Sequence, residues 1–233
     1  MKTSLIAFAA LLCATPAAAE VSGFIGVTSH YMSRGTDQNV KDRPDIQGGI
    51  TYTSDAGYYA TVFASTMNFG ETAYAAVPED TTKELDFFIG KKTQVGKTTV
   101  DVGIASINYP DNHMPWNFVE YYLKAERPVG DNGASIGGMI GYTNHYFSVY
   151  GQGVWLETHG SYPITDKTTL SASVAHQSLP NDFDYSTWNI GATYAVLPDV
   201  FVDVRYSDTD GHDLDPIFRT YDAEVSVTLT KVF

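Results

Sequence analysis

The sequence predicts an all-β protein: a transmembrane, antiparallel, up-and-down β-barrel of about twelve strands, preceded by a cleaved signal peptide. Three observations predict this fold. The chain begins with an export signal, polar and apolar residues alternate in segments long enough to cross a bilayer, and short connections alternate with long ones. A sheet in a water-soluble protein shows the same alternation, so the export signal and the connections decide between the two.

Residues 1–19 have the pattern of a secretory signal peptide. Lys2 precedes a short apolar run, and residues 17–19 supply an Ala-x-Ala cleavage site. The apolar run is too short to span a bilayer as a helix. Cleavage would leave residues 20–233 as the barrel and would remove Cys13, the only cysteine, so we expect no disulfide.

Twelve segments are expected to be strands, each near the ~9–11 residues that a tilted transmembrane strand needs. In the clearest of them, Val119, Tyr121 and Leu123 interleave with Glu120 and Lys124, which places apolar and polar side chains on opposite faces. The alternation is ambiguous in the segments 58–68 and 134–143. The twelve segments are 21–33, 45–53, 58–68, 83–93, 98–109, 118–127, 134–143, 148–162, 168–177, 186–196, 200–208 and 220–233.

The connections between these segments alternate in length, as the periplasmic turns and extracellular loops of outer-membrane barrels do. The short connections are rich in turn residues and lie at 54–57, 94–97, 128–133, 163–167 and 197–199. The longer ones lie at 34–44, 69–82, 110–117, 178–185 and 209–219, with a less certain one at 144–147. An even number of strands then places both the N-terminus and the C-terminus of the mature chain on the periplasmic side.

Composition excludes one class of partner. The net charge is −13 for the whole chain and would be −14 for the mature chain, because the signal contains Lys2 and no acid. An acidic chain without a basic stripe is unsuited to nucleic-acid phosphates, so we expect no nucleic acid. Hydrophobic residues make up 43% of the chain, yet nothing after residue 19 resembles the apolar stretch of a transmembrane helix.

Residues 29–38 (SHYMSRGTDQ), residues 44–49 (PDIQGG) and the final Phe233 carry a resemblance that spans the mature chain. They resemble the signature of the TorF-type porin family, which is also labelled a bacterial domain of unknown function. The resemblance implies an outer-membrane barrel that acts as a porin, and it implies that Phe233 is the signal read by the barrel-assembly machinery. The signature residues are Tyr31, Arg34, Gly35, Gln47, Gly48 and Gly49.

Charged side chains in the strand registers are candidates for the barrel lumen. With Asp45, the candidates are Glu84, Asp86, Asp101, Glu120, Lys124, Glu126, Glu157, Asp203, Arg205, Asp222 and Glu224. Acids far outnumber bases in this set, so we expect a porin-like channel for small solutes or ions that prefers cations. A barrel of about twelve strands lies between filled and widely open barrels, so ion pairs that plug the lumen are the alternative. The protein would then be a structural or surface-binding barrel.

Two further patterns partly resemble known kinds of functional site. His176 and Ser178 share one side of a strand end, as in barrel deacylases that cut lipid A, but no third catalytic member is visible, so we expect no enzyme. The acidic stretch 208–215 resembles a calcium loop only loosely, and the six His residues show no paired metal spacing. We therefore expect no catalytic residue, no metal and no cofactor.

The expected location is the outer membrane of a Gram-negative bacterium, reached through the periplasm. The expected partners are outer-membrane lipid and lipopolysaccharide, the barrel-assembly machinery, and small solutes or cations. The permeant solute, the openness of the lumen and the formation of a homo-oligomer are left open.

Overall fold

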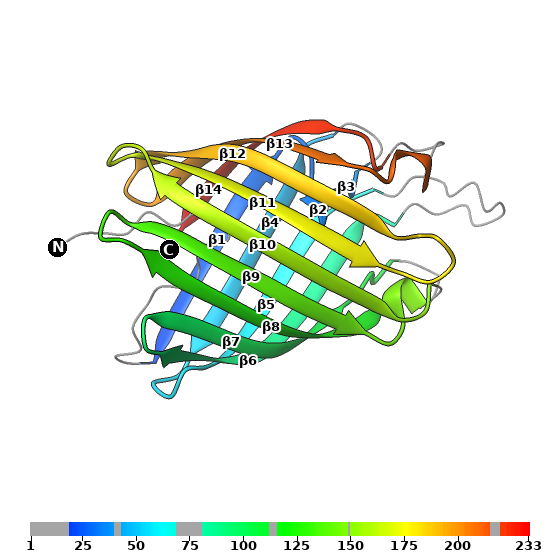
Figure 1. Cartoon of the computed structure of the whole chain (residues 1–233), viewed down its shortest axis with the longest axis horizontal. Coiled ribbons are helices and arrows are strands. Elements are labelled where there is room, and N and C mark those ends of the chain that lie inside the picture. The colour runs from blue at the N-terminus through cyan, green and yellow to red at the C-terminus, as the bar shows by residue number, and fades with distance from the viewer. Residues whose placement is uncertain (1–18, 40–42, 69–80, 112–115, 149, 215–219) are drawn as a thin grey trace.

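A computed structural model describes residues 19–39, 43–68, 81–111, 116–148, 150–214 and 220–233. Twelve antiparallel strands close into one barrel, in which each strand pairs with its neighbours along the chain and β1 closes the ring against β14 (Figure 1). The predicted fold class is therefore confirmed. The predicted signal peptide lies outside the described residues, apart from Ala19. In the described part of the chain, no helix combines the length and the apolar character needed to cross a membrane.

The barrel strands are β1 (Glu20–Thr28), β4 (Asp45–Thr53), β5 (Tyr58–Thr66), β6 (Lys83–Val95), β7 (Thr98–Ile107), β8 (Phe118–Val129), β9 (Ala134–Thr143), β10 (Gly153–Pro163), β11 (Thr168–Ser178), β12 (Tyr185–Leu197), β13 (Val200–Thr209) and β14 (Glu224–Val232). A separate two-stranded hairpin consists of β2 (Met32–Ser33) and β3 (Thr36–Asp37). Two short 3-10 turns, η1 (Tyr146–Ser148) and η2 (His212–Leu214), lie in longer connections. These longer connections lie at one end of the barrel, and the short turns lie at the other (Figure 1).

Each strand presents an apolar face outward and a polar face inward. On β14, Val225, Val227 and Leu229 are exposed, whereas Ser226 and Thr230 are buried. On β8, Val119, Tyr121 and Leu123 point outward and Glu120 points inward. An outward apolar band around a polar interior is the pattern of a barrel whose solvent is lipid.

Glycines in β9 make room for large polar side chains in the interior. A Cβ on Gly137 would lie 2.0 Å from Glu126 Oε2 and 2.5 Å from His159 Nε2. A Cβ on Gly141 would lie 2.9 Å from the carboxylate carbon of Glu120. The segment that was ambiguous by alternation is therefore a strand whose missing side chains admit the charges of β8 and β10.

Three predicted boundaries were wrong by four or five residues, and the others lie within two residues of the observed strand ends. The segment predicted as 21–33 ends at Thr28, because the chain leaves the sheet there and forms the β2–β3 hairpin. The segment predicted as 148–162 begins only at Gly153, because η1 precedes it and places Phe147 and Ser148 at positive φ, 45° and 54°. The last segment, predicted from residue 220, begins at Glu224, because residues 220–222 form a turn.

Candidate functional site: a hairpin inside the barrel

The β2–β3 hairpin folds into the lumen instead of lying over the mouth of the barrel. A Cβ on Gly35, at the hairpin tip, would lie 2.1 Å from Thr187 Oγ1, a buried interior residue of β12. Arg34 and Gly35 both have positive φ, 52° and 80°, which makes the tip a tight turn. At φ near 80° only glycine is free of strain, so the conformation and the contact with Thr187 both favour glycine at residue 35.

Arg34 extends from the tip to the opposite wall. Its Nη2 lies 2.6 Å from both carboxylate oxygens of Glu120 on β8, and its Nη1 donates to Gln177 Oε1 on β11 at 3.3 Å. The guanidinium carbon also lies 5.0 Å from the centre of the Trp155 ring on β10. Glu120, Gln177 and Trp155 are buried, so these contacts are sheltered from bulk water and are stronger for that reason.

Two tyrosines outside the hairpin, Tyr31 and Tyr146, also interact with charged residues of the interior. Tyr31, just before the hairpin, interacts electrostatically with Glu84 on β6. Tyr146 of η1 lies in the electrostatic field of Arg34 and Glu120. Burial raises the pKa of Tyr146, so this phenol stays neutral beside the ion pair.

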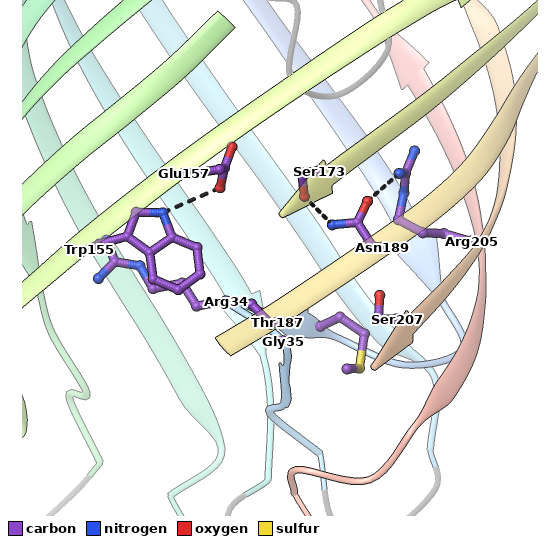
Figure 2. A pocket seen from close by; sticks show the side chains of 10 residues that line it. Arg34, Gly35, Trp155, Glu157, Ser173, Thr187, Asn189, Arg205 and Ser207 are labelled. Carbon is purple, nitrogen blue, oxygen red and sulfur yellow. Dashed lines mark hydrogen bonds between the residues drawn. The ribbon is translucent and has the colours of Figure 1, made fainter. Parts of the chain in front are cut away.

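A cavity of about 130 Å³ remains between the hairpin and the wall formed by β10, β11, β12 and β13 (Figure 2). Apart from Met32, Gly35 and Trp155, the residues that line it have polar or charged side chains, and they include both Arg34 and Arg205. By volume the cavity holds several waters or one small solute, since a water occupies about 30 Å³ in the liquid.

Arg205 is fixed by a network on the cavity wall. Its Nε donates to Asp203 Oδ1 at 3.1 Å and its Nη1 donates to Asn189 Oδ1 at 2.7 Å. Its Nη2 donates to Ser171 Oγ at 2.8 Å and to Asp203 Oδ2 at 3.0 Å. Asn189 in turn donates to Ser173 at 2.6 Å (Figure 2). The Arg205 side chain therefore has little freedom to move into the cavity.

A second network crosses from β8 to β10. His159 Nε2 lies 2.7 Å from Glu126 Oε2, and His159 Nδ1 lies 3.0 Å from Glu157 Oε1. Trp155 Nε1 donates to Glu157 Oε2 at 3.3 Å (Figure 2). Two of the predicted acids are thus brought together by a histidine that the sequence analysis did not select.

Two further predicted lumen residues, Lys124 and Asp101, interact with tyrosines and with each other. Lys124 Nζ lies 4.7 Å from the Tyr122 ring centre and interacts electrostatically with Asp101 and Glu120. Asp101 also accepts a hydrogen bond from Tyr59 at 2.8 Å.

At the end with the longer connections, Glu84 and Asp86 are buried side by side on β6, and Asp86 accepts the N–H of Asn108 at 3.2 Å. Asp45 is also buried and accepts hydrogen bonds from Asn39 and Thr66.

The predicted lumen residues Asp222 and Glu224 lie at, or just before, the start of β14. Asp222 lies in the turn before β14, 3.8 Å from His212, because the strand begins only at Glu224. Glu224 faces the interior, 3.7 Å from His30.

The remaining signature residues have structural contacts. Gln47 is buried in the interior and donates to Ser65 Oγ at 3.3 Å. A Cβ on Gly49 would lie 2.8 Å from the Phe24 ring, and a Cβ on Gly48 would lie 3.3 Å from the Phe24 carbonyl. Phe233 is exposed, and its backbone pairs with Gly23 through bonds of 2.8 and 3.0 Å.

The two rejected patterns lie elsewhere. His176 and Ser178 are exposed on the outside of β11, and His176 Nδ1 lies 3.2 Å from Ser186 Oγ on the next strand. In the acidic stretch 208–215, His212 Nε2 lies 3.5 Å from Asp208 Oδ1, and Asp215 falls outside the described residues.

Sequence reasoning missed the role of Arg34, and it did not select Trp155, His159 or Gln177 as site residues. His159 could have been found, because it lies two residues from Glu157 and therefore on the same strand face. Arg34 was known only as a signature residue in an expected external loop. No local pattern tells whether such a loop folds outward or inward.

Comparison with known families identifies the group to which this hairpin and barrel belong. The model of a family described as "Bacterial protein of unknown function (Gcw_chp)" matches residues 13–233. The chain belongs to the Gcw_chp family. The membership agrees with the bacterial family of unknown function that the signature implied. Among curated proteins, no match to this Gcw_chp chain was found.

Solved structures of porins resemble this Gcw_chp barrel in fold. A structure of the KdgM porin in complex with disordered oligogalacturonate aligns with a TM-score of 0.60 at 9% identity, covering 92% of this chain and 99% of that one. The NanC porin aligns with a TM-score of 0.58 at 12% identity, covering 91% and 98%. An outer membrane channel from Pseudomonas putida F1 aligns with a TM-score of 0.55 at 9% identity, covering 96% and 98%. At these identities the likeness establishes a shared fold.

Proposed function

We propose that this protein is an outer-membrane porin-like channel through which small hydrophilic solutes or ions diffuse passively. The observation that carries the proposal is the interior of the closed barrel, where charged side chains of the wall and of the inserted hairpin surround a polar cavity. Ionised groups at membrane depth need water or ionised partners. Such an interior suits a hydrophilic solute and excludes a lipid-like one.

The β2–β3 hairpin would be the constriction of this channel. It crosses the lumen from β1 and reaches interior residues of β8, β11 and β12. An anchored loop of this kind would narrow the path, and the cavity beside Arg34 and Arg205 is the space that it leaves on one side.

Fold and resemblance support the same proposal. KdgM, NanC and the channel from Pseudomonas putida F1 are described as porins or an outer membrane channel, and the KdgM structure was obtained with an oligogalacturonate. The TorF-type signature points the same way. We accordingly propose an outer-membrane location in a Gram-negative bacterium, with lipid, lipopolysaccharide and the barrel-assembly machinery as partners.

We also propose a preference for cations. Acids outnumber bases among the interior candidates, and fixed negative charge raises the local concentration of cations. The preference should be modest, because Arg34, Arg205 and His159 lie against several of the acids.

Planar-bilayer conductance of the purified, folded barrel tests the channel. We expect discrete conductance steps, and larger steps for Arg34→Ala, because the hairpin loses its attachment to Glu120 and Gln177. Arg127→Ala is the matched control: Arg127 is an exposed arginine on β8, so the same charge is lost without a change at the hairpin.

A barrel that is folded by heat-modifiable gel migration but silent in the bilayer would contradict the channel. It would favour the structural or surface-binding alternative. We expect no catalysis from His176 and Ser178, and release of an acyl chain from lipid A, detected by mass spectrometry, would overturn that expectation.

A further inference from the structure

His30, Asp37 and Glu224 converge where the hairpin meets the barrel wall. His30 lies in the connection between β1 and β2, Asp37 ends β3, and Glu224 begins β14. His30 Nδ1 lies 2.8 Å from Asp37 Oδ2, and His30 Nε2 lies 3.7 Å from Glu224 Oε2. One donor atom from each of the three residues lies within 4.8 Å of the other two, and in the described part of the chain no other group of His, Cys, Asp and Glu does so.

The three side chains are held in place by their surroundings. Asp37 Oδ1 accepts the backbone N–H of Asn39 at 2.9 Å, which orients Oδ2 toward the imidazole. The carbonyl of His30 accepts a hydrogen bond from Thr28 Oγ1 at 2.8 Å, and the N–H of Asp37 donates to the Thr220 carbonyl at 2.8 Å. Asp37 is buried and the other two are partly buried, so the cluster is a formed site and not a set of mobile surface charges.

Two other histidines in this structure each have two carboxylates nearby, and they show what is particular about His30. Glu157 and Glu126 lie at opposite nitrogens of His159, at 3.0 and 2.7 Å, as Asp37 and Glu224 do at His30. His212 is half exposed, with carboxylates 3.5 and 3.8 Å away. What distinguishes His30 among the described residues is that one of its nitrogens and one oxygen from each carboxylate all lie within 4.8 Å of one another, which the donor atoms around His159 and His212 do not.

The chemistry of the donors selects the ion. One imidazole nitrogen with two carboxylates suits borderline divalent metals such as Zn²⁺ or Co²⁺, whereas Ca²⁺ and Mg²⁺ prefer sites made of oxygen alone. Asp45, which interacts electrostatically with both Asp37 and His30, adds further negative potential for a cation.

We propose that His30, Asp37 and Glu224 bind one divalent transition-metal ion of the Zn²⁺ class, with water completing its coordination. Binding would displace any proton that His30 shares with Asp37 and release it to solvent. The ion would join β3 to β14 and so fix the base of the inserted hairpin to the closing strand. Metal binding at this site does not depend on transport, so a failure of the channel proposal would leave the metal-site proposal intact, and the reverse also holds.

Isothermal titration calorimetry on the chelator-treated, folded barrel tests the site, with Zn²⁺ alone and Co²⁺ alone as probes. We expect one ion per chain, proton release on binding, and a visible absorption band for the Co²⁺ form. Glu224→Gln keeps the size of the side chain, and we expect it to weaken binding at least tenfold. His30→Ala should abolish the Co²⁺ band.

His159→Ala is the matched control, because it removes a histidine that also lies between two carboxylates and should leave metal affinity unchanged. Heat-modifiable migration of each variant shows that the barrel has formed. The proposal is overturned if the wild-type barrel binds neither ion, or if Glu224→Gln and His30→Ala bind as the wild type does. Equal affinity for Mg²⁺ would also overturn it, since that would indicate unspecific attraction to acids.

Discussion

Arg34 and Gly35 stand next to each other at the hairpin tip and place different demands on it. Position 34 requires a long, positively charged side chain, because Arg34 contacts Glu120 across the lumen. Position 35 has no room for a side chain, because Thr187 occupies the space that a Cβ would take. Both residues also adopt positive φ, which is unfavourable for an arginine and free of strain for a glycine. The polar contacts of Arg34 outweigh this local strain.

Gly35→Ala should displace the hairpin tip. The new Cβ would meet Thr187 Oγ1 at 2.1 Å, and alanine is strained at φ 80°. We expect a lower temperature for loss of the folded gel band and a larger single-channel conductance. Gly96→Ala is the control, because Gly96 also has positive φ but has nothing within 4 Å of its Cβ position. Equal effects from the two variants would show that the contact with Thr187 is unimportant.

Removal of either partner of the Arg34–Glu120 pair should destabilise the barrel. Glu120 is buried, so Arg34→Ala removes the guanidinium that pairs with its carboxylate, and breaking a buried ion pair in this way typically destabilises a protein by about 3–5 kcal/mol. In a double-mutant cycle with Arg34→Ala and Glu120→Ala, we expect a coupling free energy of about 1–3 kcal/mol. The measurement is denaturant unfolding in detergent micelles. Additive effects would mean that the two side chains do not interact in solution.

At the scale of the element, the β2–β3 hairpin is short, and contacts with the barrel wall hold it in position. Two residues per strand bury little apolar surface, so Tyr31, Arg34 and Gly35 must hold it through polar contact and close fit. The barrel strands are different, because each is bonded to two neighbours along its length and faces lipid on one side. The hairpin is therefore the element that can be altered while the barrel stays closed.

Strand β14 yields a prediction about assembly. Phe233 is exposed, and its implied role is that of the signal read by the barrel-assembly machinery. We expect Phe233→Ala to lower the amount of assembled barrel in cells strongly, as measured by heat-modifiable migration of membrane fractions. Tyr194→Ala, which removes another exposed aromatic from the outer face, should have a small effect. Normal insertion of Phe233→Ala would remove the assembly role.

At the scale of the whole molecule, the closed sheet divides the side chains between two solvents. Closure of β1 against β14 leaves no free sheet edge, so every strand pairs on both sides within the lipid. The outward apolar side chains then meet lipid, and the acidic excess of the sequence is concentrated in the interior and in the connections.

Ion selectivity is the property of the whole interior that can be measured. We expect a reversal potential that favours cations at 0.1 M salt and a weaker preference at 1 M, because the screening length falls from about 10 to about 3 Å. Arg34→Ala should increase the preference by removing a positive charge from the constriction, and Arg127→Ala should not. A reversal potential that favours anions would contradict the cation preference and leave the channel itself intact.

The sequence by itself determined the barrel, its inward and outward faces and most of its strands. The predicted segments 45–53 and 134–143 agree with β4 and β9 residue for residue, and the alternation of β8 assigned its faces correctly. This succeeded because lipid outside and polar groups inside impose a period of two on every strand, and a period of two is a local signal.

Only the tertiary structure decided what the lumen contains. Arg34 and Glu120 are 86 residues apart, and His159 and Glu126 are 33 apart, so no local pattern connects them. Their meeting depends on the closure of the ring, on the register between strands and on the inward turn of a loop. The sequence did not mark the end of β1 either, because no Gly or Pro lies between Thr28 and Gly35, and these are the residues that most clearly end a strand.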